Sequence, residues 1–259
     1  MPQRTSYKQG TPSWVDLQTT DVDAAKAFYG GLFGWKFDDQ PMPDGAPYSM
    51  ALVGADTVAA IAPQSPMQAE MNIPPMWNTY LAVDSADDAV AKAGAAGGTI
   101  LMPATDIPGA GRMAFVADPT GAAVGLWQAS GHIGATLVNE PNTVVWNELT
   151  TADNSRALPF YREVAGIESA ETKMGDFDYT LLKVDGADVG GATSPQMDGV
   201  PNHWHVWFAV ADAEALASAA TAAGGSLLAK PMDMPIGKVA TIRDPQGAVF
   251  SILQPATGE

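Results

Sequence analysis

The sequence predicts an α+β fold of four β-α-β-β-β units, arranged as two tandem domains with cup-shaped mixed sheets and helices outside. Three observations lead to this prediction. The chain contains an internal repeat, each half of the repeat divides into two similar parts, and each part combines one helical pattern with four strand-like runs. Alternation of strand and helix periods within a repeated unit is typical of layered α+β domains.

The repeat is clearest in two segments, PSWVDLQTTDVDAAKAFYGGLFG at 12–34 and VVWNELTTADNSRALPFYREVAG at 144–166, which match at an offset of 132. Later matches, such as WNTYLAV with WHVWFAV, have an offset of 127 or 126. Insertions in loops explain the slippage. We therefore predict a first domain at 11–130, a linker at 131–141 and a second domain at 142–256.

The first unit begins with a strand at 14–18, where apolar and polar side chains alternate. Thr20 and Asp21 are candidate caps of the helix that follows, and Gly34 ends that helix. Three further strands are predicted from short apolar runs: 35–38, 47–53 and 57–62.

The second unit begins with a strand at 78–83, followed by a helix at 86–96 that Gly97 and Gly98 close. Its remaining strands are predicted from three runs: 99–102, 112–117 and 122–128. The second half repeats this order. Pro-rich connectors at 63–75 and 195–201 join the units within each half.

Composition excludes several classes of protein. Thirteen Lys and Arg residues stand against 29 Asp and Glu, a net charge of −16, which argues against binding to nucleic acid or an anionic membrane. The absence of Cys removes thiolate metal sites, so any metal must use His, Asp, Glu or amide ligands. No signal-like or membrane-spanning apolar stretch is visible, so a cytoplasmic, acidic protein is expected.

The strand pattern predicts a ligand pocket on the inner face of each sheet. Val15 and Leu17 are expected to face the helix and Asp16 the cup, while Glu148 occupies the matching position of the second half. Aromatic rings beside carboxylates suit a planar or cationic aromatic small molecule. The candidate pocket residues are Trp14, Asp16, Asn78, Tyr80, Trp127, Trp146 and Trp207.

The paired units, the motif FYGGLFGW at 28–35, the stretch AVDSADDAVAKAGAAGG at 82–98 and the DPTG and DPQG turns resemble the vicinal oxygen chelate superfamily. This superfamily includes glyoxalase I, bleomycin-resistance proteins and extradiol dioxygenases. More narrowly, the chain is similar to two-domain actinobacterial proteins described as glyoxalase-like or hydroxylase-like. The resemblance covers nearly the whole chain and implies the fold predicted above.

The resemblance also implies positions for a divalent metal, and most of them have lost their ligands. The first-strand positions are Trp14 and Trp146. The other positions are Asn78 and His205, Gly125 and Ser251, and Ala60 with Gly190 to Gly191. A useful site needs about three His or carboxylate ligands. No metal or other cofactor is therefore predicted, with a divalent metal left open as an alternative.

Three functions are weighed. The first is metal-independent binding of a small molecule in the cups. The second is a lyase, isomerase or hydroxylase with His205 as general base and Glu148 orienting it, which predicts a pKa near neutrality for that imidazole. The third is a non-catalytic interaction protein, monomeric or homodimeric, with relic cups. His132 and His203 are expected at the surface, and the two DPxG turns are expected to be structural.

Overall fold

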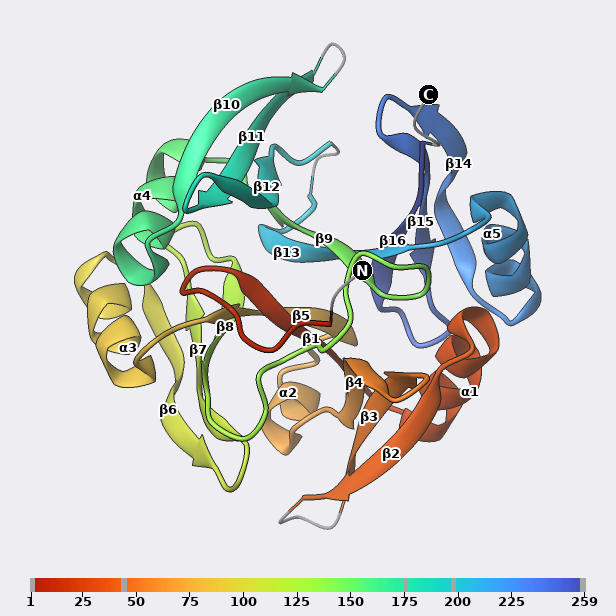
Figure 1. Ribbon diagram of the computed structural model, residues 1–259, viewed down its shortest axis with the longest axis horizontal. Helices are drawn as coiled ribbons and strands as arrows, with labels where there is room; N and C mark the ends of the chain where they lie inside the picture. The colour runs from red at the N-terminus through yellow and green to blue at the C-terminus, as the bar shows by residue number, and fades with distance from the viewer. Residues whose placement is uncertain (1–2, 43–45, 175–176, 197–198, 257–259) are drawn as a thin grey trace.

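The computed structural model of the chain describes residues 3–42, 46–174, 177–196 and 199–256. It contains two eight-stranded mixed sheets, each formed by one half of the chain, with helices packed against them (Figure 1). The α+β class and the two tandem domains of β-α-β-β-β units are confirmed. The exact domain limits of 11–130 and 142–256 stay a prediction.

The elements of the first half follow the expected order. They are β1 (Pro12–Thr19), α1 (Val22–Phe33), β2 (Lys36–Pro41), β3 (Pro47–Val53), β4 (Asp56–Pro63), α2 (Pro66–Glu70), β5 (Met76–Ala82), α3 (Ala86–Ala95), β6 (Thr99–Ile107), β7 (Gly111–Ala117) and β8 (Ala123–Ala129). The short helix α2 lies in the connector for which no element was predicted. Asp21 caps α1 by accepting from the Ala24 backbone N–H at 3.0 Å, and Gly34 ends it with φ at 68°.

The second half repeats this order without a counterpart of α2 among its described residues. Its elements are β9 (Val144–Thr150), α4 (Asn154–Ala165), β10 (Glu168–Met174), β11 (Phe177–Val184), β12 (Ala187–Thr193), β13 (His203–Ala209), α5 (Ala213–Ala222), β14 (Ser226–Met234), β15 (Gly237–Arg243) and β16 (Val249–Pro255). Strand orders in the two sheets correspond: β2-β3-β4-β1-β5-β8-β7-β6 and β10-β11-β12-β9-β13-β16-β15-β14. In each sheet the first strands of the two units pair antiparallel at the centre.

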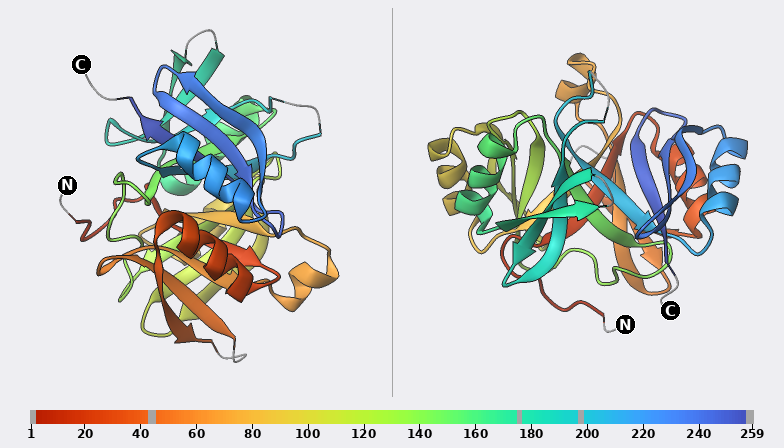
Figure 2. Two further views of the ribbon diagram at one scale, coloured as in Figure 1. Left: turned by 90° about the vertical axis from the view of Figure 1, so that its right-hand side faces the viewer. Right: turned by 90° about the horizontal axis from the view of Figure 1, so that it is seen from above.

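The helices lie on the face of each sheet away from the cup, as expected, and the same faces of the two sheets are turned towards each other. The two sheets pack back to back, with β5 against β13, and the helices form the pairs α1 with α5 and α3 with α4 at opposite ends (Figures 1 and 2). Thr79 Oγ1 donates to Asn147 Oδ1 across this junction at 2.8 Å. The halves therefore share their hydrophobic interior.

The shared interior consists of two clusters, each containing residues of both halves. Phe160 of α4 packs so closely on Gly98 that a Cβ there would lie 2.5 Å from its ring. Phe28 of α1 takes the matching place over Gly225, where a Cβ would lie 3.2 Å from its ring. The glycine pairs predicted as helix ends thus also make room for an aromatic ring of the other half.

Two buried hydrogen-bond chains cross between the halves in the same way. Trp77 Nε1 donates to Tyr29 Oη at 3.0 Å, and Tyr29 Oη donates to Asp244 Oδ2 at 3.0 Å. Trp204, Tyr161 and Asp118 repeat the arrangement at 2.9 and 2.9 Å. We call these two sets the crossing chains.

Each crossing chain ends at the Asp of a DPxG turn. Asp244 Oδ1 accepts from the backbone N–H groups of Gln246, Gly247 and Ala248, so the carboxylate also forms the turn. Burial raises the pKa of Asp244, and these hydrogen bonds oppose that effect. The turns are structural, as expected, and they also join the two halves.

Removing one hydroxyl from a crossing chain is expected to destabilise the whole molecule. In Tyr29→Phe and Tyr161→Phe a buried carboxylate loses a donor and a buried indole N–H loses its acceptor. We expect each substitution to lower the free energy of unfolding in urea by about 1–3 kcal/mol. Tyr7→Phe is the control, since its hydroxyl donates to the partly buried carbonyl of Ala135. An equal loss of unfolding free energy in all three variants would contradict a special contribution of the crossing chains to stability.

Candidate functional site

The inner faces of the two sheets carry matching hydrogen-bond chains. In the first half Trp14 Nε1 donates to Tyr48 Oη at 2.8 Å, and that hydroxyl donates to Asp16 Oδ2 at 3.1 Å. In the second half Trp146 Nε1 donates to Tyr179 Oη at 2.8 Å, and that hydroxyl donates to Glu148 Oε2 at 2.7 Å. The side chains expected in the cups therefore do share one face of each sheet. We call these faces the first cup and the second cup.

The first cup is filled by its own side chains. Trp14, Tyr80, Trp127, Ala60 and Ala135 form a buried apolar cluster, and seven partly buried residues pack against it: Tyr48, Met50, Ile107, Ala110, Met113, Phe115 and Val138. Asp16 is only 2% exposed and Asn78 only 9%. This closure corrects the expectation that both cups are open to a ligand.

The linker closes the first cup by lying across it. The backbone N–H of Ala135 donates to the Ser13 carbonyl at 2.8 Å, and Gly134, with φ at 107°, fits because a Cβ there would lie 2.2 Å from that carbonyl oxygen. The ring of His132 contacts Trp14 edge-on at 4.6 Å between centroids, and its carbonyl accepts from Trp127 Nε1 at 2.8 Å.

His132 keeps some exposure, but its ring packs on Trp14 and is not free at the surface as the sequence suggested. Its Nε2 is buried with no hydrogen-bond partner among the described residues. Burial lowers the pKa of His132 to about 4, so the ring is neutral at physiological pH. His203 is the first residue of β13, and its Nδ1 lies 2.8 Å from the Pro201 carbonyl oxygen. It remains partly exposed.

The second cup is partly exposed where the first is buried. Trp146, Glu148, His205, Trp207 and Leu253 are all half-buried. Within this cup Trp207 Nε1 is a buried donor without an acceptor among the described residues. At these five positions the second cup is thus more exposed than the first, whereas its tyrosine, Tyr179, is buried and the matching Tyr48 is partly exposed.

His205 does not form the predicted pair with Glu148, although the two residues are direct neighbours on β13 and β9. Its Nε2 lies 2.8 Å from Ser251 Oγ, which in turn lies 2.9 Å from Thr241 Oγ1. Burial and the nearby His203 lower the pKa of His205 to about 3. The expected pKa near neutrality is therefore wrong, because desolvation disfavours the charged form of the ring.

Glu148 accepts fewer side-chain hydrogen bonds among the described residues than Asp16, its counterpart in the first cup. Tyr179 Oη is its hydrogen-bond donor among the described side chains, whereas Asp16 has three. Burial raises the pKa of Glu148, and the hydrogen bond from Tyr179 opposes that effect. Tyr179 itself has a strongly raised pKa, because it is buried beside this carboxylate.

The residues of neither cup fit the metal site that the family resemblance implies. Residues 60, 125, 191 and 251 are Ala, Gly, Gly and Ser, and at 125 and 191 a tyrosine occupies the space that a larger side chain would need. A Cβ on Gly125 would lie 2.2 Å from Tyr80, and one on Gly191 would lie 1.9 Å from Tyr179 Oη. The described residues contain no group of three His, Cys, Asp or Glu side chains placed to hold a metal ion.

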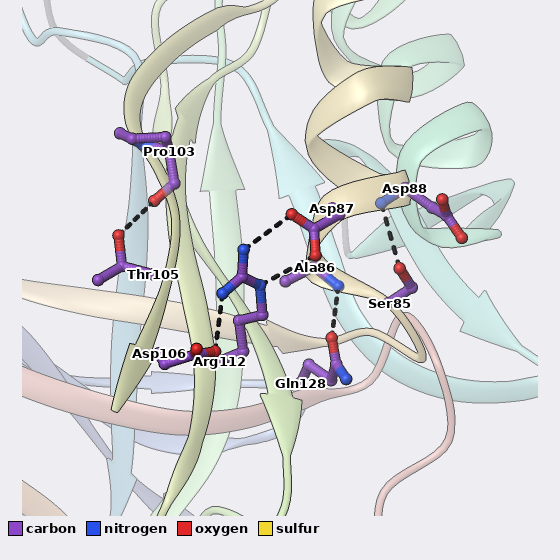
Figure 3. A network of polar contacts seen from close by, with 9 residues as sticks. All are labelled: Ser85, Ala86, Asp87, Asp88, Pro103, Thr105, Asp106, Arg112 and Gln128. Carbon is purple, nitrogen blue, oxygen red and sulfur yellow. Dashed lines mark hydrogen bonds and ion pairs between the residues drawn. The ribbon is translucent and has the colours of Figure 1, made fainter. Parts of the chain in front are cut away.

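Two hollows of the surface lie outside both cups. One, of about 550 Å³, lies between α5 and β14. The other, of about 320 Å³, borders Arg112, whose guanidinium is paired with Asp87 at 2.9 Å and Asp106 at 2.7 Å (Figure 3). With both carboxylates in place, Arg112 holds β6, β7 and α3 together and offers no free charge to an anionic ligand.

The fold and the paired cups agree with comparisons of the chain with known proteins. The chain belongs to the glyoxalase/bleomycin resistance protein/dioxygenase superfamily, whose model matches residues 11–126, and a model for a glyoxalase-like domain matches residues 143–253. A protein named putative glyoxylase CFP32, from Mycobacterium tuberculosis, is 56% identical over 99% of both chains. The anthracycline biosynthesis protein DnrV of Streptomyces peucetius is 34% identical and matches 96% of this chain and 95% of its own.

Solved structures of low sequence identity share the fold. The Mn(II)-bound glyoxalase of Novosphingobium aromaticivorans has a TM-score of 0.65 at 17% identity, covering 97% of this chain and 86% of its own. The 2,3-dioxygenase LapB of Pseudomonas sp. KL28 has a TM-score of 0.66 at 15% identity, covering 97% and 94%. No helix of the described part of this chain is long and apolar enough to span a membrane.

Sequence reasoning missed Tyr48 and Tyr179, which connect tryptophan to carboxylate in each cup. Each lies near the start of an apolar run predicted as a strand, at an offset of 131 from the other. Asp16 and Glu148 are separated by 132 residues, within one residue of that offset. The internal repeat could therefore have identified the two tyrosines as equivalent residues. Ser251 was considered only as a lost ligand position.

The lowered histidine pKa values predict a loss of stability in acid. Unfolded histidine takes up a proton near pH 6.5, whereas folded His205 and His132 do so near pH 3 and 4. Their contribution is complete above pH 6.5 and falls as the pH drops towards 4, because only the unfolded chain binds these protons. We expect His205→Gln and His132→Gln each to reduce the slope of unfolding free energy against pH by up to about 1.4 kcal/mol per pH unit.

Urea unfolding at pH 7.5, 6.5, 5.5 and 4.5 measures this slope. Asp16 and Glu148, whose pKa values are raised, act with the opposite sign in every variant, so the difference from the wild type isolates the histidines. Unchanged slopes would show that both rings take up protons at the same pH in the folded protein as in the unfolded chain.

Proposed function

We propose that the protein binds a planar aromatic small molecule in the second cup, without a catalytic metal. The observation that carries this proposal is the difference in exposure between the two cups. Trp14, Asp16 and Tyr80 are buried in the first half, where the linker packs on Trp14 and Trp127, whereas the matching Trp146, Glu148 and Trp207 are partly exposed in the second. A concave face with aromatic walls and a few polar groups is the usual form of a small-molecule site.

The relatives support a role in the chemistry of small molecules. Their printed names are putative glyoxylase and anthracycline biosynthesis protein, and both kinds match this chain over nearly its whole length. The family also contains metal-dependent members, such as the Mn(II)-bound glyoxalase. The donor set of the second cup favours binding over metal chemistry in this chain, because one imidazole and one carboxylate are each engaged elsewhere.

A second candidate, an enzyme acting through Glu148, rests on the raised pKa of that carboxylate. A carboxylate held in a partly desolvated cup is a stronger proton acceptor than one in water. His205 then serves as a neutral neighbour and not as the base, in line with its lowered pKa. The interaction protein with relic cups, the cytoplasmic location and the monomeric or homodimeric state remain predictions.

The ligand site is tested by making one chemical change in each cup. Trp207→Leu removes an aromatic side chain from the second cup. Trp127→Leu makes the same substitution in the first cup, at a position where the second half already has a leucine, Leu253. We screen planar two-ring aromatics by thermal shift, since a ligand at 100 times its Kd stabilises the fold by about 2.7 kcal/mol. Trp207→Leu is expected to weaken binding about tenfold, and Trp127→Leu to lower the Tm and leave Kd unchanged. The reverse pattern would move the site to the first cup.

Metal independence has its own test. We expect protein purified without chelator to contain less than about 0.1 equivalent of any divalent transition metal, because no three His, Cys, Asp or Glu side chains come together among the residues that the structure describes. Elemental analysis measures this content, and treatment with EDTA should change neither the Tm nor ligand binding. One equivalent of metal, lost from a Glu148→Gln variant, would contradict the proposal.

A further inference from the structure

The first cup shows how this sheet geometry satisfies a carboxylate. Asp16 accepts hydrogen bonds from Tyr48 Oη at 3.1 Å, Asn78 Nδ2 at 2.8 Å and Tyr80 Oη at 2.7 Å. All three donors are neutral, and two are phenol hydroxyls. A buried carboxylate requires such partners, because desolvation without them is costly.

The second cup lacks two of these three donors. Glu148 keeps the tyrosine, Tyr179, but the positions of Asn78 and Tyr80 are taken by His205 and Trp207. The imidazole of His205 is engaged with Ser251, and Trp207 Nε1 has no partner among the described residues. Glu148 is therefore left with one side-chain donor in a half-buried position.

One pair of residues explains why the second cup is incomplete. Tyr80 crosses directly over Gly125 on the neighbouring strand, where a Cβ would lie 2.2 Å from its ring. The equivalent neighbour of Trp207 is Ser251, whose side chain is buried and bonded to His205. A ring at position 207 is thus prevented from lying across the sheet towards the carboxylate as Tyr80 does.

We propose that the ligand of the second cup is a planar aromatic compound with a hydroxyl group, and that this hydroxyl donates to Glu148 as Tyr80 donates to Asp16 in the first cup. The inference rests on the proposed function, since it names the class of ligand for the same site. The aromatic ring of the ligand lies beside Trp146 and Trp207, replacing the ring that the first cup supplies from its own chain.

The chemistry of the site favours a neutral hydroxyl over a cation. The donors that satisfy Asp16 are uncharged, and no Lys or Arg side chain is bonded to Glu148 among the described residues. A neutral hydroxyl avoids the cost of removing a second charge from water, while a hydrogen bond to a carboxylate is stronger than one between neutral groups. The hydroxyl oxygen also retains lone pairs that can accept a hydrogen bond.

The test compares two probes that differ only at the hydroxyl, 2-naphthol and 2-methoxynaphthalene, by isothermal titration calorimetry at pH 7.5. The wild-type protein is expected to bind 2-naphthol at least about tenfold more tightly, because only this probe donates a hydrogen bond. In Glu148→Leu the two affinities should become equal. Retention of the tenfold preference in Glu148→Leu would overturn the assignment of Glu148.

A second variant rebuilds the first cup in the second. Trp207→Tyr combined with Ser251→Gly supplies the phenol and clears its path, so Glu148 gains an internal donor in place of the ligand. We expect this double variant to lose at least about tenfold in affinity for 2-naphthol and to keep or raise the Tm. The matched control is Trp207→Tyr combined with Ser251→Ala, in which the remaining Cβ still keeps the ring off Glu148, as a Cβ on Gly125 would displace Tyr80; this variant should retain the preference for 2-naphthol. Unchanged affinity in the double variant with Ser251→Gly would overturn the proposal.

The outcomes separate this inference from the proposed function. Equal binding of both probes to the wild-type protein overturns the hydroxyl requirement and leaves the aromatic site in place. Absence of binding by either probe up to 1 mM, roughly the weakest affinity worth assigning to a specific site, contradicts both.

Discussion

The structure depends on the burial of two tyrosine hydroxyls that join the halves of the chain. Tyr29 and Tyr161 each accept from a tryptophan of their own half and donate to an aspartate turn of the other half. A carboxylate in this interior is tolerated only with several donors, so each turn, helix and central strand must keep its place. The sheets are consequently fixed back to back, and both cups face away from the common core.

Within this frame, small differences in sequence give the cups different properties. The linker follows the first sheet and covers the first cup with Ala135 and the ring of His132. Gly125 leaves room for Tyr80 to donate a hydrogen bond to Asp16. The equivalent residue of the second cup, Ser251, is instead hydrogen-bonded to His205. One cup is completed by its own side chains, and the other retains a carboxylate with unfilled capacity for hydrogen bonds. Because the two halves share one fold, the buried first cup can be compared directly with the candidate site in the second cup.

The repeat, the order of elements and the face on which Asp16 and Glu148 lie could be predicted from the sequence, because these follow from local periodicity and self-similarity. The association of the halves could not, since the contact of Phe160 with Gly98 joins residues far apart in the chain. The behaviour of His205 was also beyond sequence reasoning. Its pKa depends on desolvation in the assembled cup, which favours the neutral ring and which the sequence does not show.

The central claim is that the second cup, and not the first, receives the ligand. The chain has seven tryptophans, of which Trp14 and Trp127 lie in the first cup and Trp146 and Trp207 in the second. Fluorine NMR of protein labelled with 5-fluorotryptophan, assigned by single Trp→Phe variants, follows all of them during a titration with 2-naphthol. The account predicts shifts for Trp146 and Trp207 and unchanged resonances for Trp14 and Trp127. Shifts confined to Trp14 and Trp127 would contradict it.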